Sequence, residues 1–391
     1  MSCELGVTVT QETFLSIALY ISLALTTFAT IFITNSLGPR KTSLLALYLS
    51  ILFTVLCAVV PNYWTLLLSR IMIGIGIGMN TTPSGVFFTN GASCRKVYLQ
   101  GTFVWIVAFE MGAAYVGVLG YFVLEYLSWR EFILLTSMPL LVPPILLLHF
   151  VVTEDITASP DPVDHEKERT RDNSASSSGA GDGETECILE RNTVSSPKFP
   201  ALRLLKASLC PFLTFFLAFG NVLLLPILLR EIKLRRGKED EMEDRCAGAV
   251  QGSDYLLLAI INSGMIVGAI LGGWLHDRFP FKIVYPTVAA FMTACLMILS
   301  FYRDVYWFIV LFGFIFNAML EILDTERYFT QFDALVFGRE NLTVVSSVIQ
   351  AAASFGSLFG SSCAAFIAPP EALIVCTIAN ALLIFAMFLL K

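Results

Sequence analysis

Long apolar stretches recur along the whole chain, and they constrain its fold more than any other feature. Of the 391 residues, 56% are hydrophobic and only 14% are charged, whereas about a quarter of the residues are charged in an average soluble domain. A single soluble core could not bury so many apolar side chains, because most of a folded chain's surface must face water. The sequence therefore predicts a polytopic helical membrane protein embedded in a lipid bilayer, with no nucleic-acid partner.

Eleven stretches are long enough to cross a bilayer as helices, since roughly 20 apolar residues span its hydrocarbon core. They cover residues 13–34, 43–61, 64–89, 98–122, 132–152, 206–229, 255–275, 283–301, 305–332, 342–367 and 371–390. Residues 153–205 are rich in Ser and Gly and poor in apolar residues, which predicts a disordered, acidic, cytoplasmic linker. We therefore expect an all-α fold of two bundles, five helices in residues 1–152 and six in residues 206–391.

Basic residues in the short loops predict the orientation of these helices. If the chain starts outside, nine Lys and Arg residues lie on the inner side and two, Arg130 and Arg303, lie on the outer side. The loop 230–253 disagrees, because it would place six further basic residues outside, beside six acidic ones. The short loops together favour an outside start. Residues 1–39 contain no Lys or Arg, so a cleaved secretory signal is not expected.

The sequence predicts neither an enzyme nor a metal site. The nine Cys residues are scattered with no CxxC pair, and none of the three His residues stands beside a Ser or Cys nucleophile. The run Gly74-x-Gly76-x-Gly78 lies inside an apolar helix with no strand before it, so it is not a nucleotide-binding loop. We expect no cofactor. These and other spaced glycines are instead predicted to let helices pack closely.

One predicted helix carries a stripe of polar residues on a single face. Its members follow the spacing i, i+4, i+7, i+11 and i+14, and they are Asn317, Glu321, Asp324, Tyr328 and Gln331. Such a stripe cannot face lipid, so we expect it to face a water-filled pathway or a partner helix. Two acids one turn apart repel each other, which favours binding a proton or a cation. The favoured interpretation is a pathway lining, and the alternative is an ion-pair network involving Arg327.

Further polar residues lie at membrane depth in other predicted helices. Glu110 lies halfway along the fourth helix, and Arg70 in the third is its expected partner by charge, in a functional or a structural role. Gln350 begins a second polar stripe with Ser354, Ser357 and Ser361. Asn221 and Asn262 are isolated amides that either contact substrate or bond to a neighbouring helix. Together with the stripe on residues 317–331, they form the predicted substrate and ion pathway.

Two short basic links occupy matching places in the two halves. Residues 35–41 (NSLGPRK) separate the first and second helices, and residues 273–282 (GWLHDRFPFK) separate the seventh and eighth. Both links resemble the G-x-x-x-D-R-x-G-R-K loop of the major facilitator superfamily, although Asn35 and Pro39 depart from it. The stretch 70–78 with Pro83, the pair Trp129-Arg130 and the stretch 329–339 also resemble segments of that superfamily. Their order is most similar to the synaptic-vesicle-2-related proteins and the organic cation/anion transporters.

This resemblance implies a major facilitator fold that lacks the family's first helix, which would explain eleven helices and an outside start. It also implies that residues near the inner ends of the helices control conformational switching. Their positions in this chain are Asn35, Gly38, Arg40, Lys41, Asp277, Arg278, Lys282 and Arg339. The departures in the first link put the efficiency of that switching in question.

The leading functional hypothesis is a secondary transporter that moves a small organic solute by alternating access between the two bundles. The acidic stripe favours an organic cation or a proton-coupled solute, with a proton or Na⁺ as coupling ion. The alternative is a degenerate or truncated transporter-like protein with a binding or regulatory role and no transport. In either case we expect a multi-pass protein of the plasma membrane or an intracellular vesicle membrane.

Overall fold

A computed structural model describes residues 9–60, 62–91, 95–124, 126–150, 201–236, 252–279, 281–302, 305–333 and 342–389. These ranges contain eleven helices and no strand, which confirms the predicted all-α fold. The helices are α2 (Val9–Leu37), α3 (Pro39–Val59), α4 (Tyr63–Gly91), α5 (Arg95–Val123), α6 (Trp129–Phe150), α8 (Ala201–Arg236), α9 (Gly252–Arg278), α10 (Phe281–Phe301), α11 (Tyr306–Asp333), α12 (Leu342–Phe366) and α13 (Pro369–Leu389).

Most of the described helices have the length and composition of membrane spans. Among the described residues, seven carry a stretch long and apolar enough to cross a bilayer, namely α2, α3, α6, α9, α10, α11 and α12. Three more, α5, α8 and α13, carry shorter apolar stretches. Large apolar side chains such as Phe28, Phe32 and Phe385 are exposed on the outward faces, where a soluble protein would place polar groups. This surface fits a lipid environment.

Several helices extend beyond the stretches predicted from sequence. α2 begins at Val9 rather than residue 13, and α8 spans Ala201–Arg236 rather than 206–229. Residues 201–205, predicted as the end of the linker, therefore form the first turn of α8. The apolar pattern marks only the part of a helix that matches the hydrocarbon core, and helices continue into polar surroundings on either side. The rest of the predicted linker, residues 153–200, lies outside the described residues.

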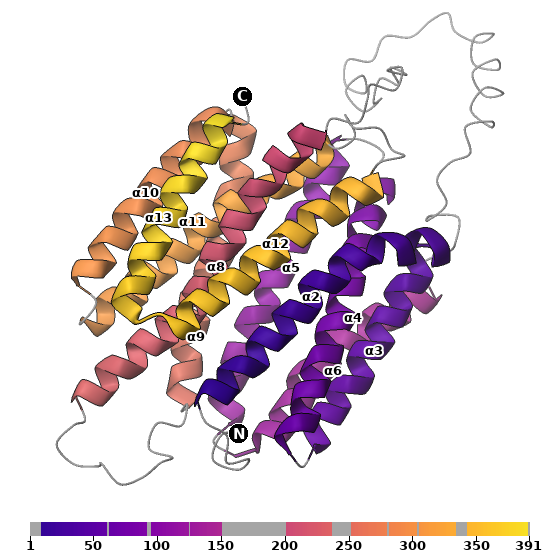
Figure 1. Cartoon of the computed structure of the whole chain (residues 1–391), viewed down its shortest axis with the longest axis horizontal. Coiled ribbons are helices and arrows are strands. Elements are labelled where there is room, and N and C mark those ends of the chain that lie inside the picture. The colour runs from indigo at the N-terminus through magenta and orange to yellow at the C-terminus, as the bar shows by residue number, and fades with distance from the viewer. Residues whose placement is uncertain are drawn as a thin grey trace, which may run out of the picture.

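The helices are arranged in two groups that meet along the middle of the molecule (Figure 1). The first group, or first bundle, contains α2 to α6, and the second group, or second bundle, contains α8 to α13. α4 packs against both α2 and α3, and α3 also packs against α6. In the other group α8 packs against α12 and α13, and α9 packs against α11. The groups contact each other through α2 with α12 and α5 with α9, and α5 packs more extensively on α9 than on any helix of its own half. The division into domains at the linker stays a prediction.

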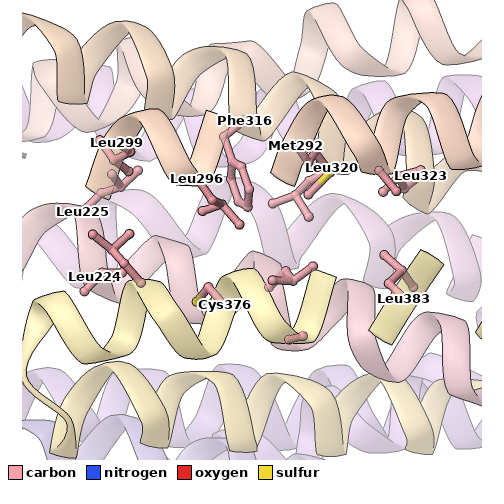
Figure 2. Close-up of a cluster of buried hydrophobic side chains, with 14 of the residues drawn as sticks. Leu224, Leu225, Met292, Leu296, Leu299, Phe316, Leu320, Leu323, Cys376 and Leu383 are labelled. Atoms are coloured by element: carbon pink, nitrogen blue, oxygen red, sulfur yellow. The ribbon is translucent and has the colours of Figure 1, made fainter. Parts of the chain in front are cut away.

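Among the side chains that the structure describes, the second group has the larger apolar core. Figure 2 shows part of this core, and the residues labelled there come from four helices, α8, α10, α11 and α13. They are Leu224, Leu225, Met292, Leu296, Leu299, Phe316, Leu320, Leu323, Cys376 and Leu383. In the first group the buried positions of α2 and α3 include many hydroxyl residues, such as Thr27, Thr30 and Ser43. A helix interface built from small residues gains stability from close backbone contact rather than from large apolar side chains.

Glycines provide that close contact in both groups. A Cβ atom at Gly74 or Gly78 of α4 would collide with backbone atoms of α2, and one at Gly76 would collide with α3. The glycine run of α4 therefore serves two neighbours on alternate faces. In the second group, Gly264 and Gly268 of α9 contact α11 in the same way, while Gly356 and Gly360 of α12 contact α8. The predicted packing role is confirmed for these glycines.

The link between α2 and α3 is a single residue, Gly38. Its φ of 80° lies in the left-handed region that side chains disfavour, and α3 begins directly afterwards at Pro39. The Gly38 amide donates to Thr34 O at 2.9 Å, and the Thr42 hydroxyl donates to Gly38 O at 2.8 Å. These hydrogen bonds let α2 end and α3 begin around one residue, without a longer loop.

Candidate substrate pathway

The polar stripe of α11 turns toward protein and away from lipid. The side chain of Asn317 is 1% exposed and that of Glu321 is 5% exposed. Asp324, two turns from Asn317, is partly buried. The side chains of Tyr328 and Gln331 lie outside the described residues. The expectation that the stripe avoids lipid is therefore confirmed for Asn317 and Glu321.

Asn317 joins three helices through its side-chain amide. Its Oδ1 accepts a hydrogen bond from Asn221 Nδ2 of α8 at 3.0 Å. Its Nδ2 donates to Asn262 Oδ1 of α9 at 3.2 Å and to Ile261 O at 3.3 Å. Asn221, Asn262 and Asn317, which we call the asparagine cluster, were predicted from three separate helices. The structure brings them together within the second bundle.

Glu321 extends this polar region along α11. It follows Asn317 by one helical turn, so the two side chains leave the same face of α11 about one turn apart. Apolar neighbours such as Leu320 and Leu323 belong to the core on the other faces of α11. A buried acid one turn from a cluster of amides can hold a cation, share a proton or accept further hydrogen bonds.

The polar stripe of α12 has a different arrangement. Gln350 is partly buried, and the hydroxyls of Ser354 and Ser357 donate to carbonyls of their own helix, at 2.9 Å and 3.1 Å. Gly356 and Gly360 lie on the side that packs against α8. Those two glycines lie on a neighbouring face of α12, about 100° from the stripe. The hydroxyls of Ser354 and Ser357 are thus satisfied within α12, and Gln350 lies on a different helix from the members of the asparagine cluster.

Arg70 lies on α4, in the first bundle. Its side chain is partly buried, and its Nε atom is fully buried with no hydrogen-bond partner. The predicted partner Glu110 lies on α5, and its side chain is outside the described residues. α4 and α5 contact each other only slightly. The pairing of Arg70 with Glu110 therefore stays a prediction.

The residues of the predicted switch loops differ in their contacts and in their exposure. Arg40 donates from Nε to Leu148 O at 3.0 Å and from an Nη atom to His149 O at 3.1 Å, so it binds the last turn of α6. Arg278 stacks on Trp274 of its own helix, 4.8 Å from the ring centre. Asn35 and Lys41 are exposed. The side chains of Asp277 and Lys282, and all of Arg339, lie outside the described residues.

Arg130 has a role that the sequence did not reveal. It stacks on Trp129 and donates to Ala58 O and Val60 O, at 3.2 Å and 2.7 Å, at the end of α3. Arg40 therefore binds the last carbonyls of α6 from the start of α3, while Arg130 binds the last carbonyls of α3 from the start of α6. We call this pair the reciprocal arginine caps.

Asn380 is a further buried polar residue, and it is not among the predicted pathway residues. Its side chain is 0% exposed, and its Nδ2 donates to Ala289 O at 2.8 Å and to Thr293 Oγ1 at 2.9 Å, joining α13 to α10. The sequence could have indicated Asn380, because it is a lone amide within an apolar helix, as Asn221 is. Its contacts are those of a helix-packing residue.

Comparison with known proteins agrees with this architecture. The sequence model of the Major Facilitator Superfamily matches residues 1–324. A curated protein of Caenorhabditis elegans with the name "Putative transporter svop-1" is 26% identical over 143 residues, which are 36% of this chain and 26% of that protein. The match thus covers about a quarter of that relative. Since the family match covers most of the chain and the structure is an all-helical membrane fold, the chain belongs to the Major Facilitator Superfamily of membrane transporters.

Proposed function

We propose that this protein is a secondary transporter that moves a small organic solute, either an organic cation or a proton-coupled solute, by rocking its two bundles around a central site. The observation that carries the proposal is the burial of Glu321 one turn from the asparagine cluster. The transporter name of the Caenorhabditis elegans relative supports it. The same proposal holds that the protein is related to the synaptic-vesicle-2-related proteins. It also holds that the protein resides in the plasma membrane or an intracellular vesicle membrane.

A carboxylate inside a membrane carries a large free-energy cost. An ionised acid at this depth is expensive unless it is paired, and such residues in transporters mark substrate or proton pathways. The neighbouring asparagines supply both donors and acceptors, so they can orient a bound solute without adding charge. A proton or Na⁺ suits Glu321 as the coupling ion, because either one neutralises the acid during transport.

Uptake into proteoliposomes of the purified chain tests the proposal. The panel contains organic cations, anions and sugars, each measured with and without an inward proton gradient. We expect saturable, gradient-dependent uptake of one class, and a reduction of about tenfold to a hundredfold in Glu321→Gln, since a charge-assisted contact is lost. Asp324→Asn should show a similar reduction. The matched control is Glu371→Gln, which removes an exposed acid at the start of α13.

The outcomes separate a transporter from a transport-inactive relative. Uptake that both α11 variants retain in full would show that the acidic stripe is structural. If folded wild-type protein takes up nothing from the panel, the transporter proposal fails for this chain. Folding is checked beforehand by a cooperative thermal transition and a single peak in size-exclusion chromatography.

A further inference from the structure

Helix α6 contains three prolines within its span, Pro139, Pro143 and Pro144. A proline has no amide hydrogen, so the carbonyl four residues earlier loses its partner within the helix, and the proline ring pushes that carbonyl outward. The carbonyl released by Pro139 is that of Leu135, which lies six residues, about 9 Å, inside the apolar stretch Trp129–Phe150. A bare carbonyl at that depth is costly, because lipid offers it no donor.

Tyr115 of α5 supplies the missing donor. Its hydroxyl donates to Leu135 O at 3.2 Å, and we call this hydrogen bond the tyrosine bond. Among the side chains described in α5, Tyr115 is the one that hydrogen-bonds to another helix. Leu135 is 41% exposed, so this side of α6 faces lipid, and the hydroxyl is the donor that the structure offers there. The carbonyls released by the two later prolines have no side-chain donor among the described residues.

The middle of α6 is packed more lightly than its ends. Of the apolar stretch of α6, 17% is buried in the protein, against 39–56% in the other six described stretches that could cross a bilayer. Both ends of α6 are bound to α3 by Arg40 and Arg130. Between these ends α6 packs mainly on α3, and α5 contacts it only slightly. A helix that is fixed at both ends, interrupted by prolines and lightly packed can bend in its middle with little loss of contacts.

From this arrangement we propose that α6 is a hinge helix that bends at Pro139, and that Tyr115 holds one position of the hinge by replacing the amide that the proline lacks. When α6 bends further or α5 moves away, the tyrosine bond breaks and Leu135 O becomes a bare polar group, which costs free energy. The bond therefore favours one position of α5 relative to α6. Since α5 is also the helix that packs extensively on α9, the hinge sets how the first bundle holds its contact with the second.

Amide hydrogen exchange of the purified full chain in lipid nanodiscs, read by mass spectrometry, tests the hinge without any uptake. Tyr115→Phe removes only the hydroxyl. It should speed exchange in residues 132–144 by about twofold to tenfold, the effect of one lost hydrogen bond. Pro139→Ala restores an amide for Leu135 O, so it should slow exchange in the same residues. In the Pro139→Ala background, Tyr115→Phe should leave exchange unchanged.

Two matched variants serve as controls. Pro143→Ala removes a proline of the same helix whose released carbonyl is not Leu135 O, so Tyr115→Phe should still speed exchange in that background. Tyr121→Phe removes the hydroxyl of an exposed tyrosine on α5 and should leave exchange in α6 unchanged.

Three results would overturn the hinge. Unchanged exchange in Tyr115→Phe would exclude the tyrosine bond as a support of α6. An equal acceleration by Tyr115→Phe with and without Pro139 would show that the hydroxyl supports the helix independently of the proline. Exchange that Pro139→Ala does not slow would exclude bending at that residue. Exchange and uptake are separate readouts, so the expected loss of transport in Glu321→Gln can succeed or fail independently of this test.

Discussion

At the scale of single residues, the side chain of Asn317 connects three helices of the second bundle. Asn317→Ala would remove the partners of Asn221 Nδ2, Asn262 Oδ1 and Ile261 O at once. Inter-helix hydrogen bonds in membranes contribute modestly, so we expect a loss of about 1–2 kcal/mol in the free energy of unfolding. Denaturant titration in detergent measures it, with exposed Asn35→Ala as the control. A loss equal to that of the control would mean that the cluster adds no stability.

Gly38 carries a backbone requirement that no other residue type meets without strain. Its φ of 80° at the link before α3 should make Gly38→Ala destabilising by about 1–3 kcal/mol. Gly112 of α5 is the matched control, because a Cβ there meets nothing within 4 Å. Gly112→Ala should be neutral or raise stability by about 0.5–1 kcal/mol, since alanine favours a helix. Equal thermal midpoints for the two variants would contradict the expected strain.

These residues also show what a sequence can reveal about a membrane protein. The spacing of Asn317 and Glu321 predicted a common face turned from lipid, because helical periodicity is local and lipid tolerates no bare polar stripe. That Asn221 and Asn262 meet Asn317 was not predictable, since it depends on how α8, α9 and α11 pack. The hydrogen-bond partners of Arg40 could not be predicted either, because they are backbone carbonyls, which every residue type carries.

At the scale of helices, the reciprocal arginine caps tie α3 and α6 together at both ends. The last carbonyls of a helix have no partner within it, and each arginine supplies donors to the other helix. Arg130→Gln should cost about 1.5–3 kcal/mol of unfolding free energy, because charge-assisted hydrogen bonds are lost. Arg40→Gln should cost a similar amount. Arg278→Gln, whose side chain is exposed and stacked on its own helix, serves as the control.

The double variant tests whether the two caps are independent. They lie at opposite ends of α3, which has 21 residues and is therefore about 30 Å long. Sites this far apart usually contribute additively. We expect Arg40→Gln with Arg130→Gln to lose the sum of the two single costs, as measured by chemical denaturation in detergent. A double variant no worse than either single one would show that α3 and α6 separate as soon as one cap is lost.

At the scale of the whole molecule, the two bundles meet closely where α5 and α9 cross. A Cβ atom at Gly120 would lie 3.1 Å from the Cβ of Tyr255, and one at Gly117 would lie 2.7 Å from that of Ala259. The Tyr255 ring also contacts Phe132 of α6, with 5.6 Å between ring centres. Two glycines of the first bundle thus accept side chains of the second at the end where α5 finishes, which the loop charges predict to be the outer end.

A transporter that works by rocking must open this contact during each cycle. Cysteines at Gly120 and Tyr255 would lie close to disulfide geometry, whose Cβ atoms are about 3.5–4.5 Å apart. Oxidation of the double cysteine variant should therefore abolish uptake, and reduction should restore it. Tyr255→Cys alone, which removes the ring and adds no clash, should stay active under both conditions. This single variant also controls for the nine native cysteines. Undiminished uptake after complete cross-linking would show that the bundles need not separate at this contact. It would exclude a rocking motion that opens α5 from α9, and transport would then require movement of other helices.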